Sequence, residues 1–158
     1  MRTATLCFLV RGYPAREVLL GLKKSGFGAG KYNGIGGKVE PGESVTAAVS
    51  REVWEEIGVR VLESQLSPVA HLTFEFPHRS GWDQIVYAYL AQEWSGVPRE
   101  SREMRPRWFG VAAIPYGEMW ADDRHWLPRV LAGERVKGWF SFCADNETVA
   151  GMELGPWV

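Results

Sequence analysis

The sequence predicts an α+β protein, an α/β/α sandwich in which a mixed β-sheet packs between two main helices. Apolar runs with strand character recur along the whole chain, while only two segments show helical signals. These helical segments do not alternate regularly with the strands, which favours a mixed sheet over a regular parallel one. The 158 residues contain no repeat or linker, so we expect a single domain over residues 1–158.

The first two predicted strands lie at residues 3–10 (TATLCFLV) and 17–24 (EVLLGLKK), with a turn at Gly12-Tyr13-Pro14 between them. A glycine-rich segment, SGFGAGKYNGIGGKVEPGES, follows at residues 25–44. Glycine has no β-carbon, so its repeated use predicts sharp turns or a close approach of the backbone to another group.

The first helix is predicted directly after this segment. Ser44 is suited to the N-cap and Gly58 to the C-terminal cap. One apolar stripe with a four-residue period runs between the caps and would face the core. Its members are Val45, Val49, Val53 and Ile57.

After the first helix, apolar and alternating runs predict five more strands and one more helix. The helix is expected near residues 122–134, after a loop that contains Pro115 and Gly117. The strands are expected at residues 69–76, 84–94, 105–111, 137–145 and 148–157, the last two as a hairpin.

The composition excludes several classes of protein. Hydrophobic residues make up 46%, charged residues 23%, and the net charge is -1, which is ordinary for a globular protein. There is no basic excess of the kind that binds a nucleic acid polymer, although a small anionic substrate remains open. Cys7 and Cys143 lie in apolar runs without metal-ligand spacing, which predicts buried thiols in a reducing compartment.

The N-terminal apolar stretch ends at Arg11, too early for a signal sequence or a membrane span. We therefore expect a cytoplasmic protein without a membrane partner. Its size and the lack of an obvious exposed apolar segment favour a monomer.

A cluster of carboxylates stands on the first predicted helix. Glu52, Glu55 and Glu56 occupy positions i, i+3 and i+4, so their side chains converge on one side of adjacent turns. Arg51 can reach Glu55, but one cation does not balance three carboxylates. Oxygen-only ligands suit Mg²⁺, with Mn²⁺ as the alternative. A solvated surface helix is the simpler explanation, and Glu43 either joins the metal shell or orients Arg51.

The wider spacing carries a family resemblance. The pattern runs from Gly37 over five residues to Glu43 and over seven more to Arg51-Glu52-Val53. It then continues, after one residue each, with Glu55-Glu56 and Gly58-Val59. This pattern resembles the complete Nudix box. The resemblance implies a Nudix fold and Mg²⁺-dependent hydrolysis of a nucleoside diphosphate linked to another group.

The resemblance also implies roles for the box residues. Glu52, Glu55 and Glu56 match metal ligands, and Glu56 is our choice for the catalytic base or principal ligand, with Glu52 and Arg51 beside it in the catalytic group. The backbone from Gly36 to Lys38 is expected at the phosphate or metal. Glu103 matches a further metal-binding acid, but an exposed charge before a strand explains it equally well.

The segments on both sides of the box narrow the substrate. The first segment is LLGLKKSGFGAGKYNGIGGKVEPGE, and the second runs from ESREMRPRWF through IPYGEMWADDRHWLP. Both resemble the animal oxidised purine nucleoside triphosphatases, relatives of MutT. This implies a pyrophosphohydrolase that converts nucleotides of the 8-oxo-dGTP and 2-hydroxy-dATP type to monophosphate and pyrophosphate, and so sanitises the nucleotide pool.

The matching positions imply a nucleotide pocket. Asn33, Asp122 and Asp123 match readers of the purine edge, while Trp120 and Phe27 match stacking walls. Phe74 matches a further apolar wall, and Lys23 matches a residue near the sugar or phosphate. Each has a simpler explanation: a turn residue for Asn33, acids at a helix N-terminus for the aspartates, and core packing for Trp120.

Two departures from the family leave the preferred base open. Tyr32 stands where the animal enzymes have tryptophan, and Trp82 replaces a smaller aliphatic residue near the pocket. Another Nudix substrate, such as a dinucleoside polyphosphate, ADP-ribose or an RNA cap, is the alternative. A second alternative is a regulator that binds a nucleotide without catalysis, but the intact acids of the Nudix box weigh against it.

Overall fold

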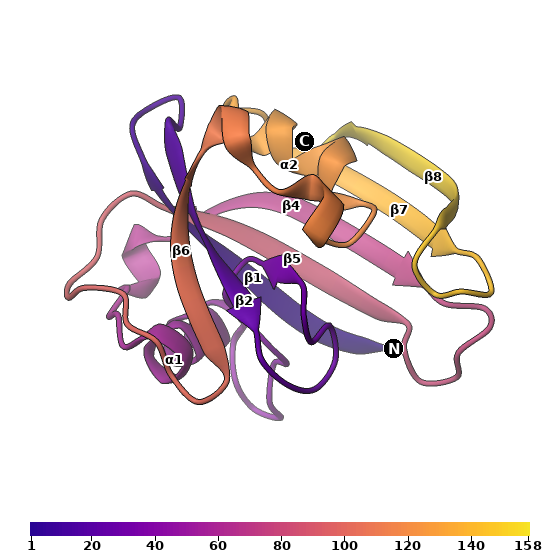
Figure 1. Ribbon diagram of the computed structural model, residues 1–158, viewed down its shortest axis with the longest axis horizontal. Coiled ribbons are helices and arrows are strands. Elements are labelled where there is room, and N and C mark those ends of the chain that lie inside the picture. The colour runs from indigo at the N-terminus through magenta and orange to yellow at the C-terminus, as the bar shows by residue number, and fades with distance from the viewer.

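The computed structural model describes residues 1–158 and contains eight strands, two α-helices and three short 3-10 helices (Figure 1). The α-helices are α1 (Val45–Ile57) and α2 (Asp123–Leu131). The 3-10 helices are η1 (Glu63–Gln65), η2 (Val111–Ala113) and η3 (Tyr116–Glu118). The strands are β1 (Arg2–Arg11), β2 (Glu17–Lys23), β3 (Tyr32–Asn33), β4 (Ser67–Glu75), β5 (Gln84–Ala91), β6 (Met104–Gly110), β7 (Val136–Phe142) and β8 (Val149–Pro156).

The strands form a mixed sheet in the order β3-β2-β1-β5-β4-β7-β8, and β6 pairs with the other edge of β2. The pairs β1–β5 and β4–β7 are parallel, whereas the other neighbours are antiparallel. The prediction of a mixed sheet is therefore confirmed.

The sheet divides where β1 and β2 separate. These strands pair only beside their turn, at Val10 opposite Val18 and Arg11 opposite Glu17. Beyond that point β1 continues along β5, while β2 continues between β3 and β6. The glycine-rich segment lies along the edge of β1 that β2 has left, where Thr5 N donates to Gly37 O at 2.9 Å. The divergence opens the space that the site described below occupies.

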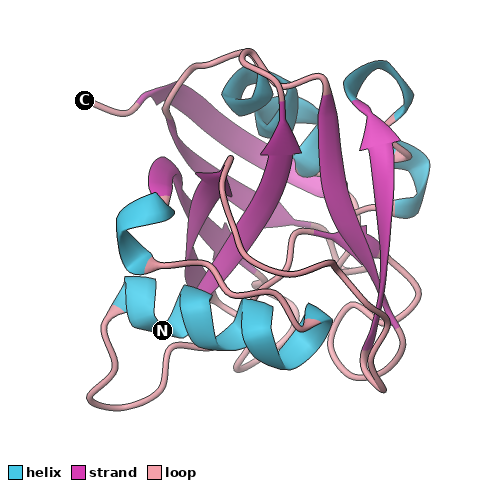
Figure 2. Cartoon of the chain, turned by 90° about the vertical axis from the view of Figure 1, so that its left-hand side faces the viewer, coloured by secondary structure: helices cyan, strands magenta, loops and turns pink.

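The two helices cover opposite faces of the strands (Figure 2). On β1, Phe8 and Val10 enter the core cluster that contains α2, and Cys7 and Leu9 enter the cluster that contains α1. A strand buried on both faces reads as a continuous apolar run, which explains the pattern TLCFLV. The predicted sandwich is confirmed.

Some details differ from the sequence-based expectations. The second helix ends at Leu131 because Gly133 adopts a positive φ of 103° and turns the chain toward β7. Cys7 is buried, and its burial raises the pKa of the thiol to about 12, but Cys143 is only half-buried. Both thiols are free.

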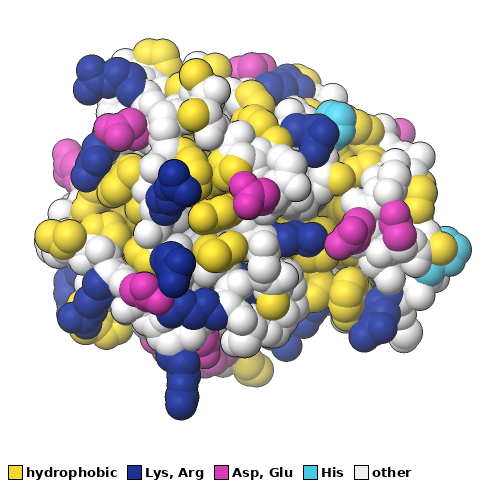
Figure 3. Space-filling view, in the orientation of Figure 1, with side chains coloured by type: hydrophobic (Ala, Val, Ile, Leu, Met, Phe, Trp, Pro, Cys, Tyr) yellow, Lys and Arg dark blue, Asp and Glu magenta, His cyan; other side chains and the backbone are white.

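Neither α-helix has the length and hydrophobicity that crossing a membrane requires. On the face shown in Figure 3, Lys and Arg side chains are interspersed with acidic and apolar ones.

Candidate active site

The helix α1 presents the acidic cluster because local signals fix both of its ends. Ser44 Oγ accepts a hydrogen bond from Ala47 N at 3.1 Å, so the predicted N-cap is confirmed. Gly58 has a φ of 67° and donates its N–H to Trp54 O, which confirms the C-terminal cap. Val49, Val53 and Ile57 are fully buried, and Val45 at the start of the stripe is partly buried.

Arg51 is the organising cation of this cluster. Its guanidinium donates to both carboxylate oxygens of Glu43, to Glu52 Oε1 at 2.9 Å and to the Lys38 carbonyl at 3.1 Å. The predicted contact with Glu55 is present at 3.3 Å. These hydrogen bonds lower the pKa of Glu43 to about 2. Of the two roles left open for Glu43, the geometry shows that it orients Arg51.

Glu56 lies deeper than the other glutamates. It is 6% exposed, and its Oε2 is buried without a hydrogen-bond partner. Burial and the negative charge of Glu52 raise the pKa of Glu56 to about 8, while Lys23 acts in the opposite direction. A buried carboxylate oxygen without a partner is costly, so this position is built for a proton or a cation.

Glycine at position 37 allows the backbone to approach the acids. A β-carbon there would lie 2.7 Å from the Glu52 carboxyl group, which is too close for any other residue without a shift. Glu55 is largely exposed and bound to Arg51, and Glu103 is exposed just before β6. No three acidic, His or Cys side chains are gathered at metal-binding distance in this arrangement.

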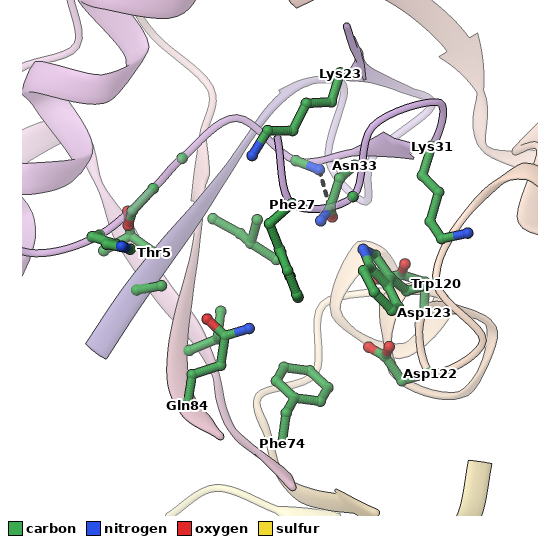
Figure 4. Close-up of a pocket in the computed structure, with 18 of the residues that line it drawn as sticks. Thr5, Lys23, Phe27, Lys31, Asn33, Phe74, Gln84, Trp120, Asp122 and Asp123 are labelled. Atoms are coloured by element: carbon green, nitrogen blue, oxygen red, sulfur yellow. Dashed lines mark hydrogen bonds between the residues drawn. The ribbon is translucent and has the colours of Figure 1, made fainter. Parts of the chain in front are cut away.

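A pocket extends from the backbone beside the acidic cluster to Trp120 and the aspartates, but Glu52, Glu55 and Glu56 are not among the residues that line it (Figure 4). All seven residues expected to bind the nucleotide line it, and they come from β2, β3, β4, the glycine-rich loop and the segment before α2. The seven are Lys23, Phe27, Asn33, Phe74, Trp120, Asp122 and Asp123. Gly36, Gly37 and Lys38 line the end nearest to Glu52. All seven thus lie in one cavity, as a nucleotide site requires.

The two residues expected as stacking walls lie against each other. Phe27 and Trp120 stack on each other, with ring centroids 5.2 Å apart and planes 21° apart. A base between two rings needs about 7 Å, twice the usual contact distance. The two side chains therefore form one wall, and a base has to stack beside them.

Trp82 lies behind this wall and outside the pocket lining. Its ring meets Phe27 edge-on at 4.7 Å and Phe76 edge-on at 5.4 Å. Trp82 therefore affects the pocket indirectly, through the support it gives to Phe27.

Asp122 and Asp123 are both buried, and neither side chain caps α2. Asp122 accepts a hydrogen bond from Trp126 Nε1 at 2.9 Å, while burial raises its pKa to about 6. Asp123 Oδ2 is buried without a partner, and burial together with the charge of Asp122 raises its pKa well above the ordinary value. Both carboxyls therefore hold a proton more readily than a free aspartate does, and a proton shared by the pair would give one acceptor beside one donor.

Comparison with known proteins decides the family. The sequence profile of the NUDIX domain matches residues 1–130. The chain belongs to the Nudix hydrolase family. It is 40% identical over 156 residues to the oxidized purine nucleoside triphosphate hydrolase of Mus musculus, covering 98% of this chain and 96% of the mouse protein.

The protein of the same name from Danio rerio is 44% identical over 144 residues, which cover 90% of this chain and 89% of that protein. Among solved structures, the mutator MutT protein of Bacillus halodurans superposes with a TM-score of 0.81 at 25% identity, covering 98% of this chain and 97% of that one. The Nudix fold that the sequence predicts is thus confirmed.

The Nudix site suits the divalent metal that the family generally uses. The unpartnered Glu56 Oε2 and the adjacent Glu52 carboxylate offer hard oxygen ligands, and Gly37, which follows Gly36, lies against the Glu52 carboxyl group. The positive charge of Arg51 does not neutralise both Glu52 and Glu56, and a metal cation would balance the remaining negative charge.

Sequence reasoning missed several residues that line this Nudix pocket. Arg2, Thr5 and Gln84 come from the adjacent ends of β1 and β5, and Phe76 and Phe142 extend the aromatic surface. Their position depends on the pairing of distant strands, which leaves no motif in the sequence. Lys24, the neighbour of Lys23, pairs with Glu100 outside the pocket.

Proposed function

We propose that this Nudix hydrolase converts oxidised purine nucleoside triphosphates to the monophosphate and pyrophosphate. The observation that carries the proposal is one cavity with two chemically different ends. Asp122 and Asp123 are buried at one end beside Trp120, and Gly36 and Gly37 connect the other end to the glutamates of α1. A purine fits the first end, which places its phosphates toward the second.

The base end offers a defined set of donors and acceptors. Asn33 Oδ1 accepts a hydrogen bond from Gly34 N at 2.8 Å, so its amide nitrogen is the group free to donate to a base. Protonated Asp123 donates to a base carbonyl, and ionised Asp122 accepts from a ring N–H. Because the proton can move within the aspartate pair, the site accommodates more than one oxidised purine.

The phosphate end supplies the reaction chemistry. Glu52 and Glu56 would hold Mg²⁺, or Mn²⁺, together with the backbone at Gly36 and with Glu55 and Glu103 at the periphery. A bound metal would supply neutralisation of the phosphate charge and acidification of an attacking water. The ionised carboxylate of Glu56 accepts a proton at its unpartnered Oε2, Arg51 holds Glu52 in place, and Lys23 binds a phosphate or the sugar.

The partners follow from the same geometry. The substrate is a small nucleotide, because one pocket brings Asp122, Asp123 and Phe74 together with the backbone at Gly36 and Gly37. We further propose a cytoplasmic monomer of one domain that binds neither a nucleic acid polymer nor a membrane.

Product analysis tests this function. The protein is incubated with Mg²⁺ and 8-oxo-dGTP, a dinucleoside tetraphosphate or ADP-ribose, and the products are separated by ion exchange. We expect 8-oxo-dGMP and pyrophosphate, with little turnover of the other two compounds. Faster cleavage of the dinucleotide or of ADP-ribose would replace the proposed substrate and leave the Nudix assignment in place.

A further inference from the structure

Gln84 is a buried polar residue that none of the roles described above uses. It is 8% exposed and opens β5, the strand between β1 and β4. In the strand register it lies opposite Arg2 on one side and Phe74 on the other, and all three line the nucleotide pocket. Neighbours in register present their side chains on the same face, so Gln84 is part of the pocket wall.

The amide of Gln84 is directed into the pocket and has no partner there. Figure 4 shows its side chain pointing into the cavity and draws no hydrogen bond to the other lining residues. Nearby, Thr5 Oγ1 donates to the Gly37 carbonyl at 3.3 Å, and Arg2, opposite Gln84 in the register, has a buried Nε without a hydrogen-bond partner. Neither side chain makes a hydrogen bond to Gln84, so a ligand in the pocket can supply partners for its amide.

The position of Gln84 defines which edge of a purine it can meet. In Figure 4 it lies across the cavity from Asp122 and Asp123, toward the side of Thr5. A purine whose six-membered ring faces the aspartates directs N9 and its sugar toward Gly36 and Gly37. The five-membered ring, with N7 and C8, then lies on the side of Gln84.

We propose that Gln84 reads the N7–C8 edge of an 8-oxopurine. Oxidation at C8 converts that edge from an acceptor beside a C–H to an N7–H donor beside an O8 acceptor. A glutamine amide carries the complementary pair, with Oε1 accepting from N7–H and Nε2 donating to O8. An undamaged purine, or one oxidised at C2, offers only the N7 acceptor. Gln84 is thus a specificity residue for damage at C8, separate from the aspartate pair.

This inference rests on the proposed function, and a substrate series separates the two. Gln84→Leu removes the amide but keeps the side-chain volume, and kcat/KM is measured for 8-oxo-dGTP, 8-oxo-dATP, 2-hydroxy-dATP and dGTP. We expect a loss of about tenfold for the two 8-oxo nucleotides and little change for the other two. Gln92→Leu, at an exposed glutamine outside this pocket, is the matched control and should change none of the four values.

Other results overturn the inference. An equal loss on all four nucleotides would mean that Gln84 contacts the sugar or only supports the fold, and an unchanged value for 8-oxo-dGTP would mean that it contacts nothing. A second measurement uses only the wild-type protein and a nucleotide that lacks the N7–H, 8-oxo-7-deaza-dGTP. We expect it to be hydrolysed about tenfold more slowly than 8-oxo-dGTP. Equal rates would also refute the role.

Failure of the proposed function gives a different pattern. If the wild-type protein hydrolyses none of these nucleotides, the calorimetric affinities of wild type and Gln84→Leu for 8-oxo-dGMP and 2-hydroxy-dAMP still decide the role of Gln84. Selective weakening of 8-oxo-dGMP binding supports it, and equal affinities or an equal loss for both ligands reject it.

Discussion

Arg51 binds Glu43 through two parallel hydrogen bonds, from Nε to Oε2 at 2.7 Å and from Nη2 to Oε1 at 2.9 Å. The same guanidinium reaches Glu52 and the Lys38 carbonyl. Arg51 therefore ties the start of α1, the glycine-rich loop and one catalytic carboxylate together. In this geometry it is a positioning residue, because its donors are directed at protein groups.

Replacing Arg51 tests its role in positioning Glu52. Arg51→Lys keeps the charge but loses the planar, two-bond geometry, so Glu52 loses its fixed orientation. We expect kcat/KM to fall about 10- to 100-fold and the Mg²⁺ concentration for half-maximal rate to rise. Arg129→Lys, which alters an exposed pair with Glu134, is the matched control and should leave both values unchanged. A metal dependence equal to that of the wild type would contradict the role.

Glu56→Gln tests the proposed base. Glutamine fills the same space and removes a buried charge, so the fold should be kept, while proton transfer is lost. We expect kcat to fall by about 10² to 10⁴ and the melting temperature not to decrease. Glu153→Gln, on the exposed face of β8, serves as the control. If the Glu56→Gln variant retained turnover, Glu56 would not be the catalytic base.

The aspartate pair predicts a pH-dependent stability. A carboxyl whose pKa is higher in the folded than in the unfolded protein holds its proton more tightly when folded. For Asp122, the free energy of unfolding thus falls as pH rises from 3.8, the ordinary value, through about 6, and stays lower above that. Asp122→Asn removes the buried charge and should stabilise the protein by about 1–3 kcal/mol at neutral pH.

Thermal melting at about pH 8 and about pH 4 measures this effect. The melting temperature of Asp122→Asn should exceed that of the wild type only at the higher pH, because at the lower pH the wild-type carboxyl is already protonated. A gain of equal size at both values would assign the effect to packing.

Asp123→Asn tests the reading of the base. Asparagine still offers a donor and an acceptor, but it cannot exchange a proton with Asp122. We expect the ratio of kcat/KM for 8-oxo-dGTP to that for 2-hydroxy-dATP to change by about tenfold. An unchanged ratio would remove the proton-shift explanation for the acceptance of two purines.

Much of the fold could be predicted because its signals are local. The caps Ser44 and Gly58, the apolar stripe between them and the strand runs each depend on neighbours in the chain. The pairing of β1 with β5 is different, because the residues from Arg2 to Leu9 pair with the distant residues from Gln84 to Ala91, and a single sequence carries no record of that contact.

The candidate site shows the same division. The acids of α1 share one helical turn, so their spacing alone indicated a common site. Gln84 and Arg2 meet only through the strand register, and sequence reasoning missed both. The stacking of Phe27 on Trp120, and the support from Trp82, depend on loop positions that no periodicity encodes.

The most direct test of the account is a parallel measurement of pyrophosphate release from 8-oxo-dGTP, 2-hydroxy-dATP and dGTP with Mg²⁺, reported as kcat/KM. The account predicts values for both oxidised purines that exceed the value for dGTP by about tenfold or more, since Gln84 favours the oxidised N7–C8 edge of 8-oxo-dGTP and the aspartate pair accommodates the altered edge of 2-hydroxy-dATP. Equal values for the three nucleotides, or no release from any of them, would contradict it.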